Sequence, residues 1–285
     1  MAWGRAPKSL SRDRWSNLLS TPAPHWELTV SLPKPRHAWM RSLLLAGVAA
    51  MALSACASNR GSMPSPDYTG VSASQGQQTI AQLAARYKAN PKDKLNLIHF
   101  AAALRAAGQS GQAVAVLEAG IGYFPKDVDI TVAYAKALTA DGRFEQSLTV
   151  LDNVIRPDVP DWNALLVKGA TLDQMGRSGE ARQIYAQALV IAPGEASVEA
   201  NLGLSYAMTN ELPAAEQHLR RAVQMRGATS QIRQNLALIV GLQGRFEECR
   251  AIYAAELPPE QVENNMAYVR ALLTQQNRWD MIAKG

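Results

Sequence analysis

Small residues recur every 34 positions along the chain after residue 94. When units are set to begin at Lys94, Val128, Trp162, Ala196 and Ser230, the eighth position of every unit is small. Those residues are Ala101, Ala135, Gly169, Gly203 and Ala237. The twentieth position is also small, and it holds Ala113, Ser147, Ala181, Ala215 and Cys249. Two such positions in each unit predict a pair of helices that pack closely there, because a large side chain would push the helices apart.

A turn signal lies between these two positions in every unit. The fifteenth position holds Gly108, Gly142, Gly176, Asn210 and Gly244. Glycine and asparagine tolerate the left-handed backbone that ends one helix and begins a turn. Large apolar residues at positions 11 and 24, such as Leu104 and Leu117, would fill the space between the helices. Prolines near position 32 (Pro125, Pro193 and, one residue late, Pro160) would end the second helix.

Both ends of the repeating region depart from the pattern. Upstream, residues 80–88 align as a lone second helix, with Leu83 at position 24 and Pro91 at position 32. Downstream, Pro258 and Pro259 interrupt the pattern, and a further helix is expected over residues 260–274. Its apolar residues at helical spacing are Val262, Met266, Val269, Leu272 and Leu273. We expect this helix to cover the open end of the fifth unit.

The 34-residue period and these aligned positions resemble the tetratricopeptide repeat (TPR). The resemblance implies an all-α fold, a TPR superhelical solenoid of about five helix pairs with a preceding half-repeat helix and a C-terminal capping helix. The five expected repeats are 94–127, 128–161, 162–195, 196–229 and 230–263. A generic alanine-rich helical bundle would not keep these positions aligned without an insertion. The low aromatic content of 6% also favours close-packed helices over a β-sheet.

The N-terminal region has the features of an export signal. Residues 43–53 form an uncharged apolar run after Arg41. The run is too short for a membrane-spanning helix, which needs about 20 residues, but it suits a signal peptide. The next residues, Leu53-Ser-Ala-Cys56, resemble the bacterial lipobox. This implies lipidation of Cys56 and, with Ala57 next to it, placement on the periplasmic face of the outer membrane. The open alternatives are an ordinary signal peptide with a chance cysteine, or an N-terminal membrane anchor.

These features predict the organisation of the whole chain. The expected segments are a leader (1–55), a lipidated flexible tether rich in Ser, Gly, Pro and Gln (56–78), the TPR solenoid (79–275) and a C-terminal tail (276–285). Residues before about 30–40 are unlike a signal peptide. Either the n-region of the signal peptide is unusually long or the start codon is assigned too far upstream. We favour the second interpretation, with the true start near Val30, Leu32 or Met40.

The basic character of the chain belongs to the leader. Seven of the 29 Lys and Arg residues and two of the 24 Asp and Glu residues lie in residues 1–55, which leaves 22 of each sign in the remainder. The expected mature chain is therefore neutral by this count. It has no polybasic stripe that would hold phosphates, so we expect no nucleic-acid partner.

Little in residues 56–285 points to catalysis. The two histidines, His99 and His218, lie in different repeats without a neighbouring pattern of acids, and no zinc-protease, nucleophile-elbow, phosphate-loop or CxxC motif occurs. Cys249 occupies a small-residue position, so we expect it to be a buried packing residue. We predict that the protein is not an enzyme, has no metal, cofactor or small-molecule substrate, and acts by binding proteins.

A candidate binding groove lies on the first helices of repeats four and five. Positions 2, 5, 6, 9, 12 and 13 line the concave face of TPR-like solenoids, and position 6 holds Asn201 and Asn235. The surrounding apolar residues are Leu204, Met208, Leu238 and Leu242. An asparagine amide offers a donor and an acceptor together, which suits a peptide backbone. Alternatively, asparagine is simply frequent at this position whatever the ligand. Because the nearby groove is mostly neutral, recognition of an acidic C-terminal tail is not expected.

The C-terminal third resembles a more specific family. The stretches are residues 201–206 (NLGLSY), 216–222 (EQHLRRA), 233–246 (RQNLALIVGLQGRF), 257–261 (LPPEQ) and 264–268 (NNMAY). They resemble TadD-like TPR lipoproteins of the Flp/tight-adherence (Tad) pilus assembly system. The resemblance implies a pilotin-like scaffold that binds a secretin or another pilus-assembly subunit. The alternatives are a general periplasmic TPR adaptor for envelope machinery and a regulatory subunit of a periplasmic hydrolase.

Overall fold

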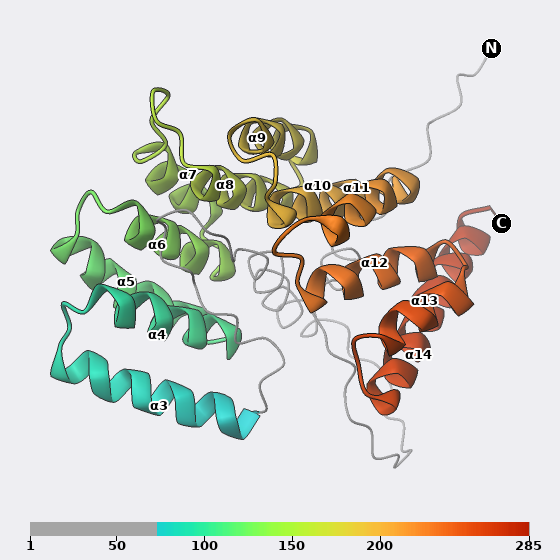
Figure 1. Ribbon diagram of the computed structural model, residues 1–285, viewed down its shortest axis with the longest axis horizontal. Helices are drawn as coiled ribbons and strands as arrows, with labels where there is room; N and C mark the ends of the chain where they lie inside the picture. Colours follow the sequence, from blue (N-terminus) through green and yellow to red (C-terminus); the bar gives the residue numbers. More distant parts are fainter. Residues whose placement is uncertain (1–72, 285) are drawn as a thin grey trace.

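The computed structural model describes the backbone of residues 73–284 and the side chains of residues 74–274. Within this part of the chain every regular element is an α-helix. The helices are α3 (Ala73–Ala89), α4 (Lys94–Ala106), α5 (Ser110–Tyr123), α6 (Val128–Ala140), α7 (Phe144–Asp152), α8 (Trp162–Gln174), α9 (Ser178–Ile191), α10 (Ala196–Met208), α11 (Leu212–Gln224), α12 (Ser230–Leu242), α13 (Phe246–Ala254) and α14 (Pro259–Lys284). They stack in chain order along an arc that has α3 at one end and α14 at the other (Figure 1).

The predicted fold class is confirmed. The first helices of the five pairs, α4, α6, α8, α10 and α12, begin at the residues from which the 34-residue units were counted. Each first helix packs against the second helix of its own pair, and α4, α6, α8 and α10 also pack against the first helix of the next pair. This pattern of contacts is that of a solenoid, in which each repeat buries its apolar face against its neighbours.

Four of the five first helices begin with the same side-chain cap. The carboxylates of Asp93, Asp127 and Asp161 and the hydroxyl of Thr229 each accept a hydrogen bond from the backbone N–H three residues later, at 2.8–3.3 Å. Such caps satisfy one of the free N–H groups at a helix start. In the remaining pair Glu195 occupies this place and makes no side-chain cap. The repeating caps reinforce the 34-residue register.

The turn inside each pair has one conformation throughout. The residues at position 15 all have positive φ: Gly108 (73°), Gly142 (79°), Gly176 (71°), Asn210 (63°) and Gly244 (83°). In each turn the next N–H bonds back to the carbonyl of position 11, as Gln109 does to Leu104 at 2.8 Å and Glu211 to Tyr206 at 3.0 Å. This bond from the residue after the left-handed one closes the helix end. The prediction that position 15 needs Gly or Asn is therefore confirmed.

The positions predicted to be small are the places where the two helices of a pair meet. The side chains at position 20, including Ser147 and Cys249, are fully buried. A Cβ added to Gly169 would lie 2.4 Å from the ring of Tyr185, and one added to Gly203 would lie 3.0 Å from the carbonyl oxygen of Ala215. Cys249 is a packing residue, as expected, and burial raises the pKa of its thiol to about 11.

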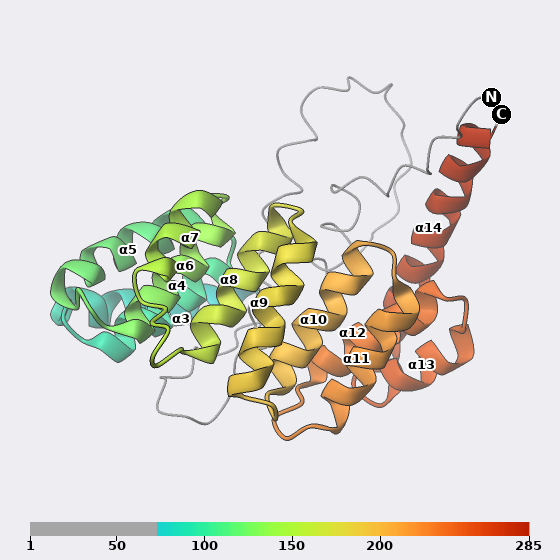
Figure 2. The same ribbon diagram turned by 90° about the horizontal axis from the view of Figure 1, so that it is seen from above.

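Both ends of the solenoid are longer than expected. Helix α3 begins at Ala73, so residues 73–78 are helical and do not belong to the tether predicted over 56–78. Helix α14 begins at Pro259, and proline is well accepted in the first turn of a helix. The helix continues to Lys284, through most of the tail predicted over residues 276–285. Figure 2 shows its far end extending away from α13. Val262, Met266 and Val269 are buried against the fifth repeat, as the capping role requires.

Candidate functional site

The predicted groove residues lie on two neighbouring first helices, α10 and α12, which pack against each other. Asn201 is only 2% exposed, and its Nδ2 donates to the carbonyl oxygen of Ser197 at 2.8 Å. The Ser197 hydroxyl is itself buried and has no hydrogen-bond partner. Asn235 is half-buried, and its Oδ1 accepts from Gln231 Nε2 at 3.1 Å. Each asparagine thus bonds one turn back along its own helix.

The apolar residues predicted to surround the asparagines belong to the core of the C-terminal repeats. Leu204, Leu238 and Leu242 are buried in one cluster with residues of α11, α13 and α14, and Met208 packs against that cluster half-buried. The structure therefore places the six predicted residues on two helices that pack together, with Asn201 and three of the four apolar side chains buried. Three of the four apolar side chains also hold the solenoid together. Their role in binding a partner stays a prediction.

The predicted lipidation site, Cys56, lies outside the described residues, as do the leader and the tether up to residue 72. In the described part of the chain no helix is both long and apolar enough to cross a membrane. The same residues contain no group of histidine, cysteine and acidic side chains that could hold a metal ion.

A polar contact between α10 and α11 joins residues whose pairing no sequence motif indicates. Glu199 on α10 is nearly buried, its Oε1 lies 2.9 Å from His218 Nδ1, and it also accepts from Arg221. Burial favours the neutral acid, but the bonds from His218 and Arg221 outweigh it and lower the pKa of the Glu199 carboxyl. His218 also stacks on Tyr206, with ring centroids 5.1 Å apart. His218 and Glu199 lie 19 residues apart in the sequence, and the packing of α10 on α11 brings them together.

The junction between repeats two and three contains a buried cluster of hydroxyl groups, which we call the hydroxyl cluster: Thr139 on α6, Ser147 on α7 and Thr171 on α8. The Thr139 oxygen lies 2.9 Å from Ser147 Oγ and 2.8 Å from Thr171 Oγ1. Backbone carbonyls also lie within reach, that of Ala135 for the Thr139 and Ser147 hydroxyls and that of Val167 for the Thr171 hydroxyl, so the one proton of each hydroxyl has an acceptor in the cluster. The cluster is thus satisfied without any charge or solvent exposure.

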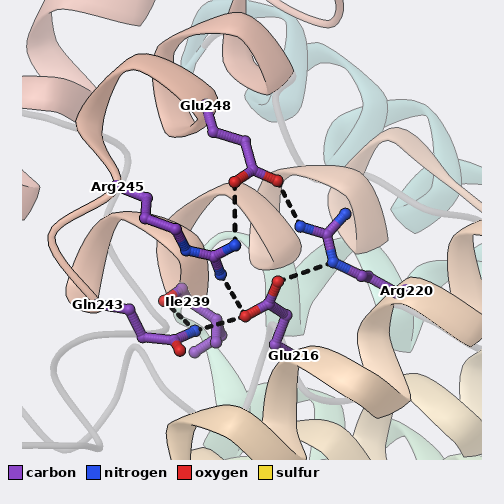
Figure 3. A network of polar contacts seen from close by, with 6 residues as sticks. All are labelled: Glu216, Arg220, Ile239, Gln243, Arg245 and Glu248. Atoms are coloured by element: carbon purple, nitrogen blue, oxygen red, sulfur yellow. Dashed lines mark hydrogen bonds and ion pairs between the residues drawn. The ribbon is translucent and has the colours of Figure 1, made fainter.

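The junction between repeats four and five instead carries a ring of alternating charges, which we call the ion ring: Glu216 and Arg220 of α11, Arg245 and Glu248 (Figure 3). Glu216 Oε1 lies 2.7 Å from Arg220 Nε, and Glu248 Oε2 lies 3.0 Å from Arg245 Nη1. Arg220 also pairs with Glu248, and Arg245 with Glu216. Gln243 adds a hydrogen bond to Glu216 at 2.8 Å. These contacts, led by that from Arg245, lower the pKa of Glu216 to about 2.

Comparison with known proteins agrees with this architecture. Two tetratricopeptide-repeat family models match the chain, over residues 104–168 and 166–231. The solved structure of TTC0263, a TPR protein of Thermus thermophilus, is 19% identical, with a TM-score of 0.53 over 69% of this chain and 99% of its own. PilW, described as a widely conserved type IV pilus biogenesis factor, is 17% identical, with a TM-score of 0.52 over 68% of this chain and 91% of its own. No curated protein sequence matches the chain.

The described part of the chain is thus a tetratricopeptide-repeat solenoid, a class of protein that generally serves as a non-catalytic scaffold for protein–protein interaction. At these identities the likeness to the two solved structures establishes the fold only.

Proposed function

We propose that this protein is a pilotin-like scaffold, anchored to the periplasmic face of the outer membrane through lipid on Cys56, which assists assembly of a Flp/tight-adherence pilus secretion machinery. Its direct partner in this proposal is a secretin or another pilus-assembly subunit. The observation that carries the proposal is the non-repeat sequence at residues 257–268, which resembles TadD-like lipoproteins beyond what any TPR would share. PilW adds that a pilus biogenesis factor can be built on this fold.

The structure gives that sequence a definite place. Leu257 is half-buried against the C-terminal core, and Val262 and Met266 of α14 are buried in it. The segment therefore caps the fifth repeat, next to α12 and its candidate binding residues. We infer that the partner contacts the first-helix face of repeats four and five, where Asn201 and Asn235 lie.

Deletion of the gene tests the assembly role. We expect loss of surface pili and of detergent-resistant secretin multimers in the outer-membrane fraction, restored by the wild-type gene. Normal pili and normal secretin multimers in the deletion strain would exclude a pilotin-like role.

Metabolic labelling with palmitate tests the anchor. Cys56→Ala should abolish incorporation and release the protein from the outer-membrane fraction. Cys249→Ala is a matched control, because alanine already occupies position 20 in three other repeats and this variant should keep its label. Undiminished labelling of Cys56→Ala would refute lipidation at this residue.

A double variant tests the candidate face. Asn201→Ala with Asn235→Ala should reduce capture of the secretin from solubilised envelopes at least tenfold. Asn153→Ala, at the exposed C-cap of α7, controls for loss of an amide elsewhere. Unchanged capture by a double variant with unaltered helical circular dichroism would place the binding site on another face.

A further inference from the structure

A buried carboxyl group lies at the junction between the third and fourth repeats. Asp173 is in the last turn of α8 and is only 4% exposed. Its Oδ2 accepts from the Tyr185 hydroxyl of α9 at 3.0 Å, and its Oδ1 accepts from the Ser205 hydroxyl of α10 at 2.8 Å. One side chain thus connects both helices of the third repeat to the first helix of the fourth.

The local packing directs the tyrosine onto this carboxyl group. A Cβ at Gly169, one turn before Asp173 on α8, would clash with the Tyr185 ring at 2.4 Å. The glycine therefore leaves room for the aromatic ring to pass between α8 and α9. Tyr185 is itself 1% exposed, so the ring has little freedom to move away.

The charges around Asp173 do not neutralise it. The cation that acts on it is Arg182 of α9, but this guanidinium bonds to Glu211 at 2.9 Å and to the Ser205 carbonyl at 3.1 Å, and lies 3.9 Å from the Tyr206 ring centroid. No ion pair of Asp173 is found among the described residues.

The other helices packed on α8 also offer no counter-charge at this point. Lys136 of α6 lies 3.5 Å from Asn163 Oδ1, at the opposite end of α8. Asp152 of α7 is an acid, and it pairs with Lys168 of α8 at 2.6 Å. On α10, Glu199 is paired with His218 and Arg221 of α11. The contacts to Asp173 come from neutral hydroxyl groups, with Ser178 of α9 as a third.

We propose that Asp173 makes the junction between repeats three and four a pH-sensitive hinge, which opens more readily in neutral than in mildly acidic solution. A buried carboxylate without a counter-ion has lost its hydration, whereas local opening of the junction restores it. The neutral acid loses much less on burial. Protonation from solvent therefore stabilises the closed junction, and the first-helix face that carries Asn201 becomes more rigid.

The direction of the titration follows from linkage. Burial raises the pKa of Asp173 from 3.8 to about 6, against the hydrogen bonds from Ser178, Ser205 and Tyr185, which lower it. When the junction opens, the carboxyl group regains its ordinary pKa. The closed state then binds more protons than the open state between about pH 4 and 6, so closure is strengthened as the pH falls through this window.

Hydrogen exchange of the full chain at pH 5.5 and 7.5, corrected for the intrinsic pH dependence of exchange, tests the hinge. The opening equilibrium of α9 and α10 amides should be about fourfold larger at pH 7.5, by linkage from the two pKa values. Amides of α6 serve as the internal reference. Asp173→Asn should remove this pH dependence while it keeps the His218–Glu199 pair. An equal pH dependence in Asp173→Asn would overturn the proposal.

A second variant covers the case in which Asp173→Asn does not fold. Tyr185→Phe keeps the carboxyl group and the ring but removes one hydroxyl donor to the carboxylate. The charged form then loses a stabilising bond, so the pH dependence of α9 and α10 opening should increase. A pH dependence that is unchanged or smaller in Tyr185→Phe would likewise reject the hinge.

Discussion

The junctions between repeats two and three and between repeats four and five are built on one backbone plan but joined by different chemistry. The hydroxyl cluster of Thr139, Ser147 and Thr171 is fully buried and neutral. In the ion ring, Arg220 and Arg245 are 46% and 40% exposed in their side chains, and only Glu216 is largely covered, at 13%. The first junction therefore depends on packing and satisfied hydrogen bonds, and the second on charges that water and salt can screen.

This difference indicates how the contacts between neighbouring repeats of a solenoid can change while the geometry of each helix pair is kept. Positions that set the helix-pair geometry keep small residues in every repeat, whereas the residues that contact the next repeat differ. A buried hydroxyl is difficult to replace, because the polar group to which it was hydrogen-bonded is then left without a partner and cannot bond to water instead. An exposed ion pair contributes about 0–1 kcal/mol and loses that contribution in salt.

The largest expected effect concerns Ser147 in the hydroxyl cluster. Ser147→Val adds two methyl groups where α6 and α7 meet and removes a hydroxyl, so the free energy of unfolding should fall by about 2–4 kcal/mol. Urea unfolding followed by circular dichroism measures this. Ser147→Ala is the matched control, since alanine fills this position in three other repeats, and it should cost about 1 kcal/mol. Equal losses in the two variants would mean that the approach of the helices is not tight there.

A smaller loss is expected for Thr171→Val, which keeps the side-chain shape. Thr139 and Ser147 retain each other and the Ala135 carbonyl as partners, so the free energy of unfolding should decrease by about 1 kcal/mol. The same loss in 20 mM and in 1 M sodium chloride, measured in urea, would fit a neutral cluster. A loss that disappears in high salt would contradict the comparison.

Glu216→Gln should have the smallest effect and the strongest dependence on conditions. Because both arginines are more than a third exposed, we expect a loss of roughly 0.5–1 kcal/mol in 20 mM salt and almost none in 1 M. The substituted glutamine would keep a side-chain oxygen for the arginines but no charge. Urea unfolding at the two salt concentrations measures the difference. A loss that persists unchanged in 1 M salt would show that packing, and not charge, joins these repeats.

The pH dependence of the unfolding free energy at acid pH tests the role of Glu216 in a second way. The folded pKa of Glu216, about 2, lies below its ordinary value of 4.5, so its contribution is present above about pH 4.5 and is lost as the pH falls through 2. Compared with the wild type, Glu216→Gln should show a shallower fall in unfolding free energy between these values. If the unfolding free energies of the wild type and Glu216→Gln fell equally with pH in this range, the result would argue against the ion ring.

Much of the fold could be predicted because the same constraint occurs in all five repeats. A left-handed turn at position 15 admits few residues, and Asn210 obeys the rule where glycine is absent. A position that admits only small side chains is equally visible, as Gly169 and Cys249 illustrate. In both cases the physical requirement acts on one residue, so it appears directly in the column of aligned residues.

The contacts between repeats could not be predicted in this way. Glu199 meets His218, and Asp173 meets Ser205, only because stacked helices bring their faces together. The 32-residue spacing of Asp173 and Ser205 recurs in Thr139 and Thr171, but the residue types differ, so the aligned positions do not show the contact. The ends were missed for a related reason. Residues 73–78 are mostly polar, so hydrophobic periodicity did not show that α3 begins at Ala73.

The extensive contacts of each helix are with helices one or two places away along the chain. Few bonds bypass a junction, so a pulling force applied between α3 and α14 would pass through every junction in turn. Junctions joined in series all carry the same tension, and the softest one extends most. The extension of the protein under load is therefore set mainly by the softest junction between the two points at which the force is applied.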